Sequence, residues 1–301
     1  KVVDAEPMSD PAKRVVLIDD SEIILEAYQK WGEACPEHLL GDFVLVIWDG
    51  EKNTLFCARD HVGIRQLYYH ASDSLFVFAS DLRGFDPFPE LLGAVNDDAV
   101  ANYLVFGELV DNRQTFFESV FKLPPAHTLM VTADSCELNC YWHPENADRI
   151  ELPDLDSYVG RLRELLDDAV TCRLRTEYPV VSHLSGGLDS SSIAAIAAKR
   201  LREREGNLHA VNWIHPPEGD EDTEQYEWKN SRIIAEKYGI SLENVELSVA
   251  DVCSLLTSRD IAYGDTARFW YESRVRDAAQ KLGARTILSG WGGDECATYH
   301  G

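Results

Sequence analysis

Short apolar runs separated by turn residues fill most of the first half of the chain, a pattern typical of antiparallel strands. Apolar runs stand on both sides of Asp49-Gly50, a pair favoured in tight turns. The predicted hairpins span residues 43–58, 66–80 and 126–142. Residues 19–39 instead carry apolar side chains at helical spacing, with Asp20 or Ser21 as the expected N-cap. We therefore expect a helix and a strand-rich antiparallel sheet in this half.

The pattern changes after a polar segment at residues 143–156, which contains two prolines and is the expected linker. Beyond it, apolar strands alternate with amphipathic helices, as in a parallel sheet with helices on both faces. The predicted strands are residues 180–184, 208–214, 245–249 and 286–289, and the predicted helices are residues 155–174, 191–201, 223–238 and 270–282. The pattern predicts two domains, an α+β domain at residues 1–145 and an α/β domain at residues 155–301.

Composition narrows the class of protein. The 301 residues are 45% hydrophobic, enough for two cores, and 52 acidic residues against 28 basic ones give a net charge of -24. This balance argues against a nucleic-acid partner, because phosphate backbones are bound by clustered Lys and Arg. Seven scattered cysteines without a CxxC pair favour reduced thiols and a cytoplasmic location.

No apolar run reaches membrane length, so we expect no membrane contact, and no signal peptide is visible. The chain starts at Lys1 without a methionine and stops at Gly301, directly after a glycine-rich motif. We interpret it as a fragment truncated at both ends.

The stretch "VVSHLSGGLDSSSIAAIAAKR" runs an apolar strand through a glycine- and serine-rich turn into a helix. Such a turn lies at the carboxyl edge of a parallel sheet, where backbone N–H groups and the helix dipole hold anions. The turn contains no lysine and no GxxxxGK[ST] motif, which argues against γ-phosphoryl transfer. Asp189 would repel a polyphosphate unless a cation intervened, and Mg²⁺ is the natural bridge.

A second loop, "SGWGGDE" at residues 289–295, follows another predicted strand and offers Asp294 as a second carboxylate for Mg²⁺. Either loop alone is open to interpretation as an ordinary turn rich in Gly, Ser and Asp. Together they favour one nucleotide site between two strand ends.

These loops resemble those of the asparagine synthetase family, in which an SGG-x-DS loop binds pyrophosphate. "GDFVLVIWD", "ARDHVGIRQLYY" and "FESVFKLPPAH" resemble its amino-terminal glutaminase-type domain, so the resemblance covers nearly the whole chain. It implies a partial class II glutaminase-like (Ntn-type) antiparallel domain followed by an adenine-nucleotide α-hydrolase-like (PP-loop) domain. It also implies an ATP-dependent ligase that adenylates a carboxylate, releases pyrophosphate and then forms an amide.

The resemblance carries over residue by residue. Asp189 and Asp294 would be the catalytic carboxylates and the Mg²⁺ ligands. The residues implied for pyrophosphate are Ser185, Gly186, Gly187, Asp189, Ser190 and Ser191, and those implied for adenosine are Leu184, Trp213, Ser289 and Gly290. Asp20 stands where the family grips the glutamine amine, although a plain N-cap explains it equally well. Aspartate and glutamine are the implied substrates, and a homodimer is left open.

The chain also departs from the family. The first cysteine, Cys35, lies inside a predicted helix, whereas the family's nucleophile is an amino-terminal cysteine. The family's NGE glutamine-binding motif is missing, and its catalytic lysine would fall after Gly301. We therefore keep a non-catalytic or degenerate nucleotide-binding homologue as one alternative. An NAD-synthetase-like enzyme or a sulfurtransferase that shares only the loop is disfavoured by the strand-rich first half.

Trp291 stands where asparagine synthetases usually have a glutamate, and an indole is neither acid, base nor metal ligand. It suits an apolar wall for a larger acyl substrate, or simple packing. The sequence here looks more like lasso-peptide macrolactam synthetases, which use the N-terminal amine of a precursor peptide, and that activity is the main alternative. We interpret His61, His127 and His183 as packed or surface histidines, because no carboxylate stands at a diagnostic spacing.

Overall fold

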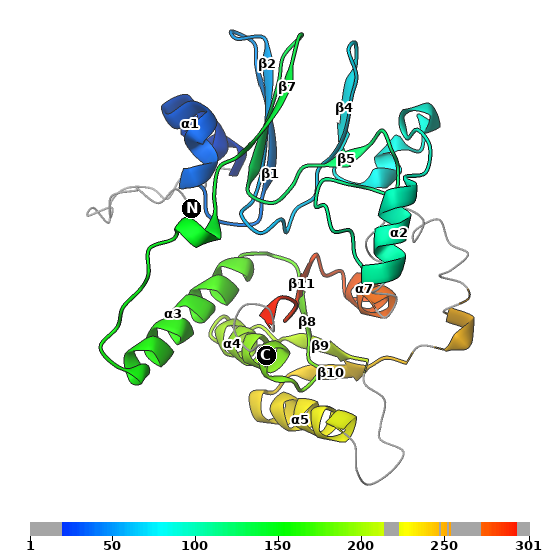
Figure 1. Ribbon diagram of the computed structural model, residues 1–301. Coiled ribbons are helices and arrows are strands. Elements are labelled where there is room, and N and C mark those ends of the chain that lie inside the picture. The colour runs from blue at the N-terminus through cyan, green and yellow to red at the C-terminus, as the bar shows by residue number, and fades with distance from the viewer. Residues whose placement is uncertain (1–19, 214–222, 247, 252, 254–271, 294–301) are drawn as a thin grey trace. The chain divides into compact units, whose positions relative to one another are not determined.

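The computed structural model describes residues 20–213, 223–246, 248–251, 253 and 272–293 (Figure 1). The chain divides into two compact units, and the division between them falls between Arg149 and Ile150. Each unit has its own hydrophobic clusters. Along the described residues, every helix is too short or too polar to cross a lipid bilayer.

The first unit is built on two antiparallel sheets. In the four-stranded sheet the order is β1-β2-β6-β7, and in the three-stranded sheet it is β4-β3-β5. The strands are β1 (Val44–Asp49), β2 (Thr54–Arg59), β3 (Tyr68–Ala71), β4 (Phe76–Ala79), β5 (Phe121–Lys122), β6 (His127–Val131) and β7 (Cys136–Cys140). The pairs β1–β2, β3–β4 and β6–β7 are antiparallel neighbours, so all three predicted hairpins are confirmed.

Alternation along β1 divides the core of this unit. Leu45 and Ile47 pack with α1 (Asp20–Trp31), whereas Val44 and Val46 pack toward a second cluster around Tyr69. Successive side chains of a strand point to opposite faces, which is why the apolar run at β1 has almost no polar position. The sheet is therefore covered on both faces.

The predicted helix at residues 19–39 is too long. The α-helix ends at Trp31, where Gly32 takes a left-handed φ of 60°, and the chain continues as the 3-10 helix η1 (Gly32–His38) around Pro36. Asp20 and Ser21 lie within the first turn of α1, so neither precedes the helix as its N-cap.

The helix α2 (Asp97–Phe106) was not predicted, because it has no apolar stripe on one face. Leu104, Val105 and Phe106 are all exposed, and only Ala99 is buried. The short 3-10 helices η2 (Leu82–Phe85), η3 (Pro89–Leu91) and η4 (Pro144–Asn146) complete the described elements of this unit.

The second unit contains a four-stranded sheet in the order β10-β9-β8-β11, and all its neighbouring strands are parallel. The strands are β8 (Val180–His183), β9 (His209–Asn212), β10 (Ser241–Asn244) and β11 (Thr286–Leu288). The helices are α3 (Leu155–Arg173), α4 (Leu188–Arg202), α5 (Thr223–Tyr238) and α7 (Glu272–Lys281). The predicted parallel sheet is confirmed.

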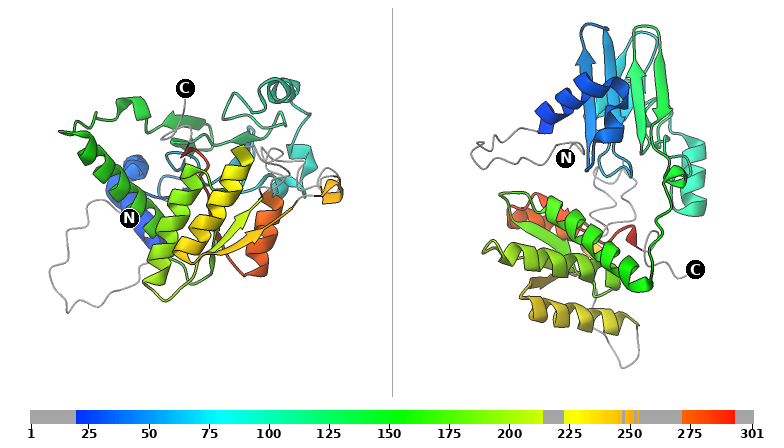
Figure 2. Two further views of the ribbon diagram at one scale, coloured as in Figure 1. Left: turned by 90° about the horizontal axis from the view of Figure 1, so that it is seen from below. Right: turned by 90° about the vertical axis from the view of Figure 1, so that its left-hand side faces the viewer.

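Helices cover both faces of this sheet, as predicted. Val180 and Leu184 pack with the alanines of α4, and α3, α4 and α5 lie side by side over that face (Figure 2). Val181 packs instead with Val275 and other residues of α7, on the opposite face. Residues of odd number in β8 therefore face α7, and this places His183 on the α7 side.

The strand predicted at residues 245–249 is wrong. The strand is β10, residues Ser241–Asn244, which pairs in register with β9 from Ser241 opposite His209. This edge strand is largely exposed and polar, so it carries no apolar run, while Val245 beyond it packs into the cluster under α7. The prediction followed the apolar residues, and here the buried apolar residue, Val245, comes after the strand instead of within it.

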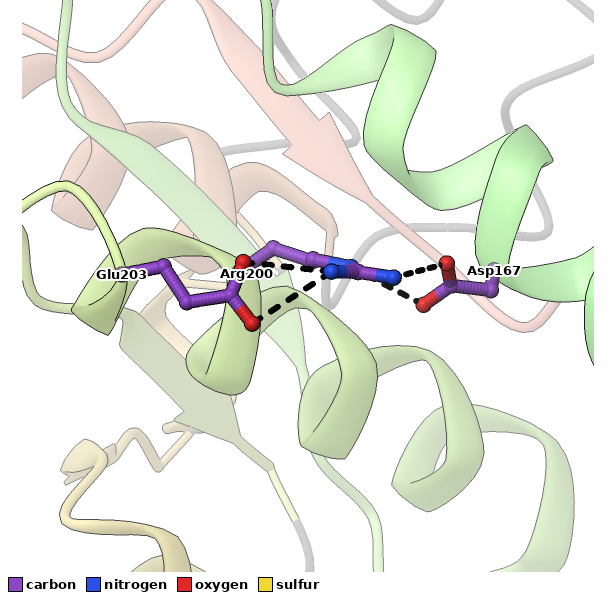
Figure 3. Close-up of polar contacts among 3 residues, drawn as sticks. All are labelled: Asp167, Arg200 and Glu203. Carbon is purple, nitrogen blue, oxygen red and sulfur yellow. Dashed lines mark hydrogen bonds and ion pairs between the residues drawn. The ribbon is translucent and has the colours of Figure 1, made fainter.

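Polar contacts join α3 to α4. Arg200 contacts Asp167 of α3 through both Nε and Nη2, and its Nη1 donates to Glu203 at 3.1 Å (Figure 3). By contrast, Leu155, Leu162 and Leu165 of α3 are exposed. The amphipathic pattern predicted this helix correctly, but much of its apolar stripe has no cover within the described residues.

Candidate functional site

The serine–glycine loop connects β8 to α4 at the carboxyl edge of the parallel sheet. Leu184 extends the strand by donating its N–H to Val211 O at 3.1 Å and is completely buried. Gly186 then turns the chain with a φ of +99°, and a β-carbon there would lie 1.9 Å from the carbonyl oxygen of Glu227. Only glycine fits between the loop and α5.

Serine side chains shape the inside of this loop. The hydroxyls of Ser185 and Ser190 lie 2.8 Å apart, and Ser185 Oγ accepts a hydrogen bond from Gly187 N at 3.2 Å. Gly187 precedes α4 without a side-chain cap, which leaves the first turn of that helix open to an anion. Ser191 Oγ is buried and has no hydrogen-bond partner within the described part of the chain.

The second glycine loop lies directly against the first, because β8 and β11 are neighbours in the sheet. A β-carbon on Gly290 would lie 2.8 Å from the Ser190 amide nitrogen. A β-carbon on Gly293 would lie 2.3 Å from Asp189 Cγ. Asp294 is outside the described residues, but the residue before it touches the Asp189 carboxyl.

An open pocket of about 330 Å³ lies between the two loops. It is lined by His183, Ser185, Gly187, Leu188, Asp189, Ser190, Trp213, Glu227, Gly290 and Trp291. The structure thus brings together seven of the predicted site residues. Leu184, Gly186, Ser191 and Ser289 belong to the same loops without lining the pocket, and Asp20 is an exposed residue of the first unit.

Three of the lining residues, His183, Leu188 and Glu227, were not predicted as site residues. Glu227 lies on α5, and its Oε1 would be 3.5 Å from a β-carbon on Gly187, directly beside the phosphate-type loop. His183 was interpreted as a packed or surface residue. It is indeed only 3% exposed, but it forms part of the pocket wall. Its ring packs edge-to-face against Trp213, with the two ring centroids 4.8 Å apart.

His183 also has a carboxylate partner that sequence spacing did not indicate. Its Nε2 lies 3.1 Å from Glu272 Oε1, an ion-pair distance without the alignment of a hydrogen bond. Trp291 Nε1 donates to the same oxygen at 3.3 Å. Burial raises the pKa of Glu272, but the contacts with His183 and Trp291 outweigh it and hold that pKa below its usual value.

The two buried cysteines of the first unit, Cys35 and Cys57, give no sign of a nucleophile. Cys35 lies buried in η1, and burial raises its pKa to about 11. Cys57 is buried in β2, and burial raises its pKa to about 12. Both thiols stay protonated near neutral pH, whereas attack on an amide requires a thiolate. The ring of His127 is engaged in a local hydrogen bond, with its Nδ1 2.7 Å from the carbonyl oxygen of Pro125.

Two protein-family models match this chain. One is described as a glutamine amidotransferase domain and covers residues 11–142, and the other is described as asparagine synthase and covers residues 161–300. The matches fall on the antiparallel and the parallel unit respectively. Both glycine loops lie inside the second match.

Among curated proteins, asparagine synthetase (glutamine-hydrolyzing) 3 of Bacillus subtilis is 34% identical over 64% of this chain. Amidase chry2 of Gibberella zeae is 29% identical and amidase chyE of Penicillium rubens 27% identical, each over 92% of this chain. The chain spans 31%, 42% and 42% of the lengths of these relatives, less than half of each.

Proposed function

Because the two halves of this chain match the models of a glutamine amidotransferase domain and of asparagine synthase, we propose that the protein is an ATP-dependent amide ligase. It activates a carboxylate as an acyl-adenylate and transfers the acyl group to an amine. The observation that carries this proposal is the contact between the two glycine loops around Asp189, at the carboxyl edge of the parallel sheet.

The chemistry of the pocket fits an outgoing diphosphate. Among the described residues that line it, none is a lysine or arginine, the side chains that γ-phosphoryl transfer commonly uses. It offers instead the hydroxyls of Ser185 and Ser190 and the uncapped first turn of α4. The buried, unpartnered hydroxyl of Ser191 adds a further donor close by.

Magnesium fits the same place. The second loop approaches Asp189 so closely that only glycine fits at 290 and 293, and Asp189 itself lines the pocket. Asp189 and Asp294 would hold the ion, as one or two carboxylates do in Mg²⁺–nucleotide sites. When bound, Mg²⁺ neutralises the charge that develops on the leaving pyrophosphate.

The proposed reaction has two steps. A carboxylate oxygen of the acyl substrate attacks the α-phosphorus of ATP, the bond to pyrophosphate breaks, and an acyl-adenylate forms. An amine nitrogen then attacks the acyl carbon, loses a proton, and AMP leaves with the electron pair of the acyl–oxygen bond. Ser185, Gly187 and Ser190 hold the diphosphate, while Trp213 and the backbone around Leu184, Ser289 and Gly290 line the adenosine side.

We take ammonia released from glutamine as the default amine, in line with the first family match. Asp20 is the residue of the described chain that we assign to the glutamine amine. A peptide amine, as in a macrolactam cyclase, is the second candidate. It is favoured by Trp291, which lines the pocket with an aromatic side chain that is 54% exposed.

ATP–pyrophosphate exchange by the full-length protein tests the proposal. Exchange with aspartate, followed by asparagine formation from glutamine, supports the default activity. Exchange with a candidate precursor peptide and not with aspartate supports the cyclase. Absence of exchange with every carboxylate, in protein that still binds MgATP, rejects the ligase and identifies a non-catalytic nucleotide-binding homologue.

A further inference from the structure

Three side chains from different elements meet at one carboxylate oxygen behind the pocket. Glu272 begins α7, His183 ends β8, and Trp291 follows β11. Glu272 Oε1 accepts a hydrogen bond from Trp291 Nε1 at 3.3 Å and lies 3.1 Å from His183 Nε2. They meet because β8 and β11 are neighbours and α7 covers the face to which odd residues of β8 point.

The three residues differ in their position relative to the pocket. The side chain of Glu272 is 15% exposed and does not line the pocket, whereas Trp291 and His183 both line it. Trp291 stands between two glycines, and Gly292 has a left-handed φ of +88°. Flanking glycines restrain the backbone weakly, and the hydrogen bond to Glu272 restrains the ring itself.

The location of Trp291 indicates which part of a substrate it meets. Gly290, directly before it, contacts Ser190 and Asp189 of the phosphate-type loop. The carboxylate attacks the α-phosphorus from the side opposite the departing diphosphate, so the acyl group would lie in the pocket beyond the α-phosphate, and Trp291 lines that same pocket. Because Trp213 and the backbone around Gly290 are already assigned to the adenosine, we assign the exposed ring of Trp291 to the acyl chain.

We propose that Glu272 is a positioning residue that fixes the Trp291 ring as the wall for the acyl substrate. This inference rests on the proposed ligase function, since it names the group that orients one substrate of that reaction. His183 Nε2 lies 3.1 Å from the same carboxylate oxygen, so a turn of the carboxylate away from the indole would also break its contact with His183. The wall is thereby ordered before the substrate binds.

Nitrogen-15 labelling of the tryptophan indoles tests the contact without any turnover. The Trp291 resonance is identified by its loss in Trp291→Phe. It is expected to move upfield in Glu272→Ala, which has no acceptor, and to return most of the way in Glu272→Gln, whose amide oxygen still accepts. Glu236→Ala, at an exposed position of α5, is the matched control and should leave it in place.

Kinetics test the positioning role. In ATP–pyrophosphate exchange, Glu272→Ala should raise the KM of the acyl substrate about tenfold, as for loss of one charge-assisted hydrogen bond. The KM of ATP should change less than about twofold, because ATP does not contact this wall. Trp291→Phe should resemble Glu272→Ala, and the double variant should be no worse than either alone. Glu272→Gln should recover most of the loss.

An unchanged Trp291 resonance in Glu272→Ala would overturn the proposal, and so would equal rises in the KM of both substrates. If Glu272→Ala does not fold, Glu272→Gln and Trp291→Phe still give the comparison. Absence of exchange in the wild type rejects the ligase function, and the indole spectra then report separately whether the contact exists.

Discussion

At the scale of single residues, Gly186 is the position at which the structure most strongly requires glycine. Its φ of +99° is unfavourable for any L side chain, and a β-carbon would lie 1.9 Å from Glu227 O. We expect Gly186→Ala to lower the free energy of unfolding of the second unit by roughly 2–4 kcal/mol. Thermal or urea denaturation measures the loss.

Gly160 provides the matched control for that substitution. It lies within α3, and nothing stands within 4 Å of the place where a β-carbon would be. Gly160→Ala should therefore be neutral or stabilise by up to about 1 kcal/mol. Equal stability of Gly186→Ala and wild type would show that the loop does not pack against α5 in this way.

Asp189 carries the second prediction at this scale. Asp189→Asn keeps the shape of the side chain but removes the charge that a Mg²⁺–diphosphate needs. We expect ATP–pyrophosphate exchange to fall about a hundredfold or more. Isothermal titration should also show that Mg²⁺ no longer strengthens binding of ATP, while the unfolding temperature stays near that of wild type.

The control for this variant is Asp168→Asn, at an exposed position of α3 that should leave exchange unchanged. Exchange at the wild-type rate in Asp189→Asn would reject the metal role of this carboxylate. Retained exchange with a higher Mg²⁺ requirement would instead assign the main metal contact to another residue, contrary to the expectation here.

The residues of the two glycine loops could be predicted from sequence because each loop is a local signal, a strand end followed by Gly, Ser and Asp. Glu272 and Glu227 could not, because nothing near them in sequence marks a site. Glu227 lies inside α5 and reaches the pocket through the packing of that helix on the sheet, whereas Glu272, at the start of α7, contacts the lining residues His183 and Trp291 from outside the pocket. A functional side chain that is placed by tertiary packing leaves no recognisable motif in the sequence around it.

At the scale of elements, burial decided which predictions held. The strands β1 and β8 have buried apolar residues and were found, whereas β10 has an exposed polar sequence and was predicted four residues too far along the chain. The helix α2 was missed for the same reason, since its apolar residues are largely exposed. Periodicity reports a buried face, so elements without one escape it.

The contact between α3 and α4 gives a prediction at this scale. Hydrogen bonding to Arg200, followed by its charge, holds the pKa of Asp167 below its usual value despite some desolvation. A carboxyl with a lowered pKa in the folded state stabilises the fold above its unfolded pKa, near 4. That stabilisation is lost as pH falls through the folded pKa.

Asp167→Asn should therefore lower stability at pH 7 and have progressively less effect below about pH 4. The difference should also shrink in high salt, because this contact is solvent-accessible. Urea titrations of both proteins across pH and ionic strength measure it. Glu164→Gln removes the exposed pair with Arg161 on the same helix and is the control, with a smaller effect expected at every pH. A penalty that is constant with pH would show that the charge of Asp167 is not what matters.

At the scale of the whole molecule, the two units are joined by a segment with little burial. Residues 143–151 are exposed, and the division between the units falls after Arg149. Each unit has its own core, so a cut at this point leaves both cores intact. Protease sites within helices or strands are protected by hydrogen bonding, whereas residues 147–150 form neither.

Limited trypsin digestion should therefore cleave after Arg149 before any other site in the described residues, and it should yield two fragments that resist further cleavage there. Mass spectrometry identifies the new amino terminus at Ile150. Arg149→Gln removes the site and should slow the separation of the fragments severalfold, whereas Arg161→Gln, within α3, should not. Cleavage inside the four-stranded sheets at a rate similar to that at Arg149 would mean that the cores are not independent of the connecting segment.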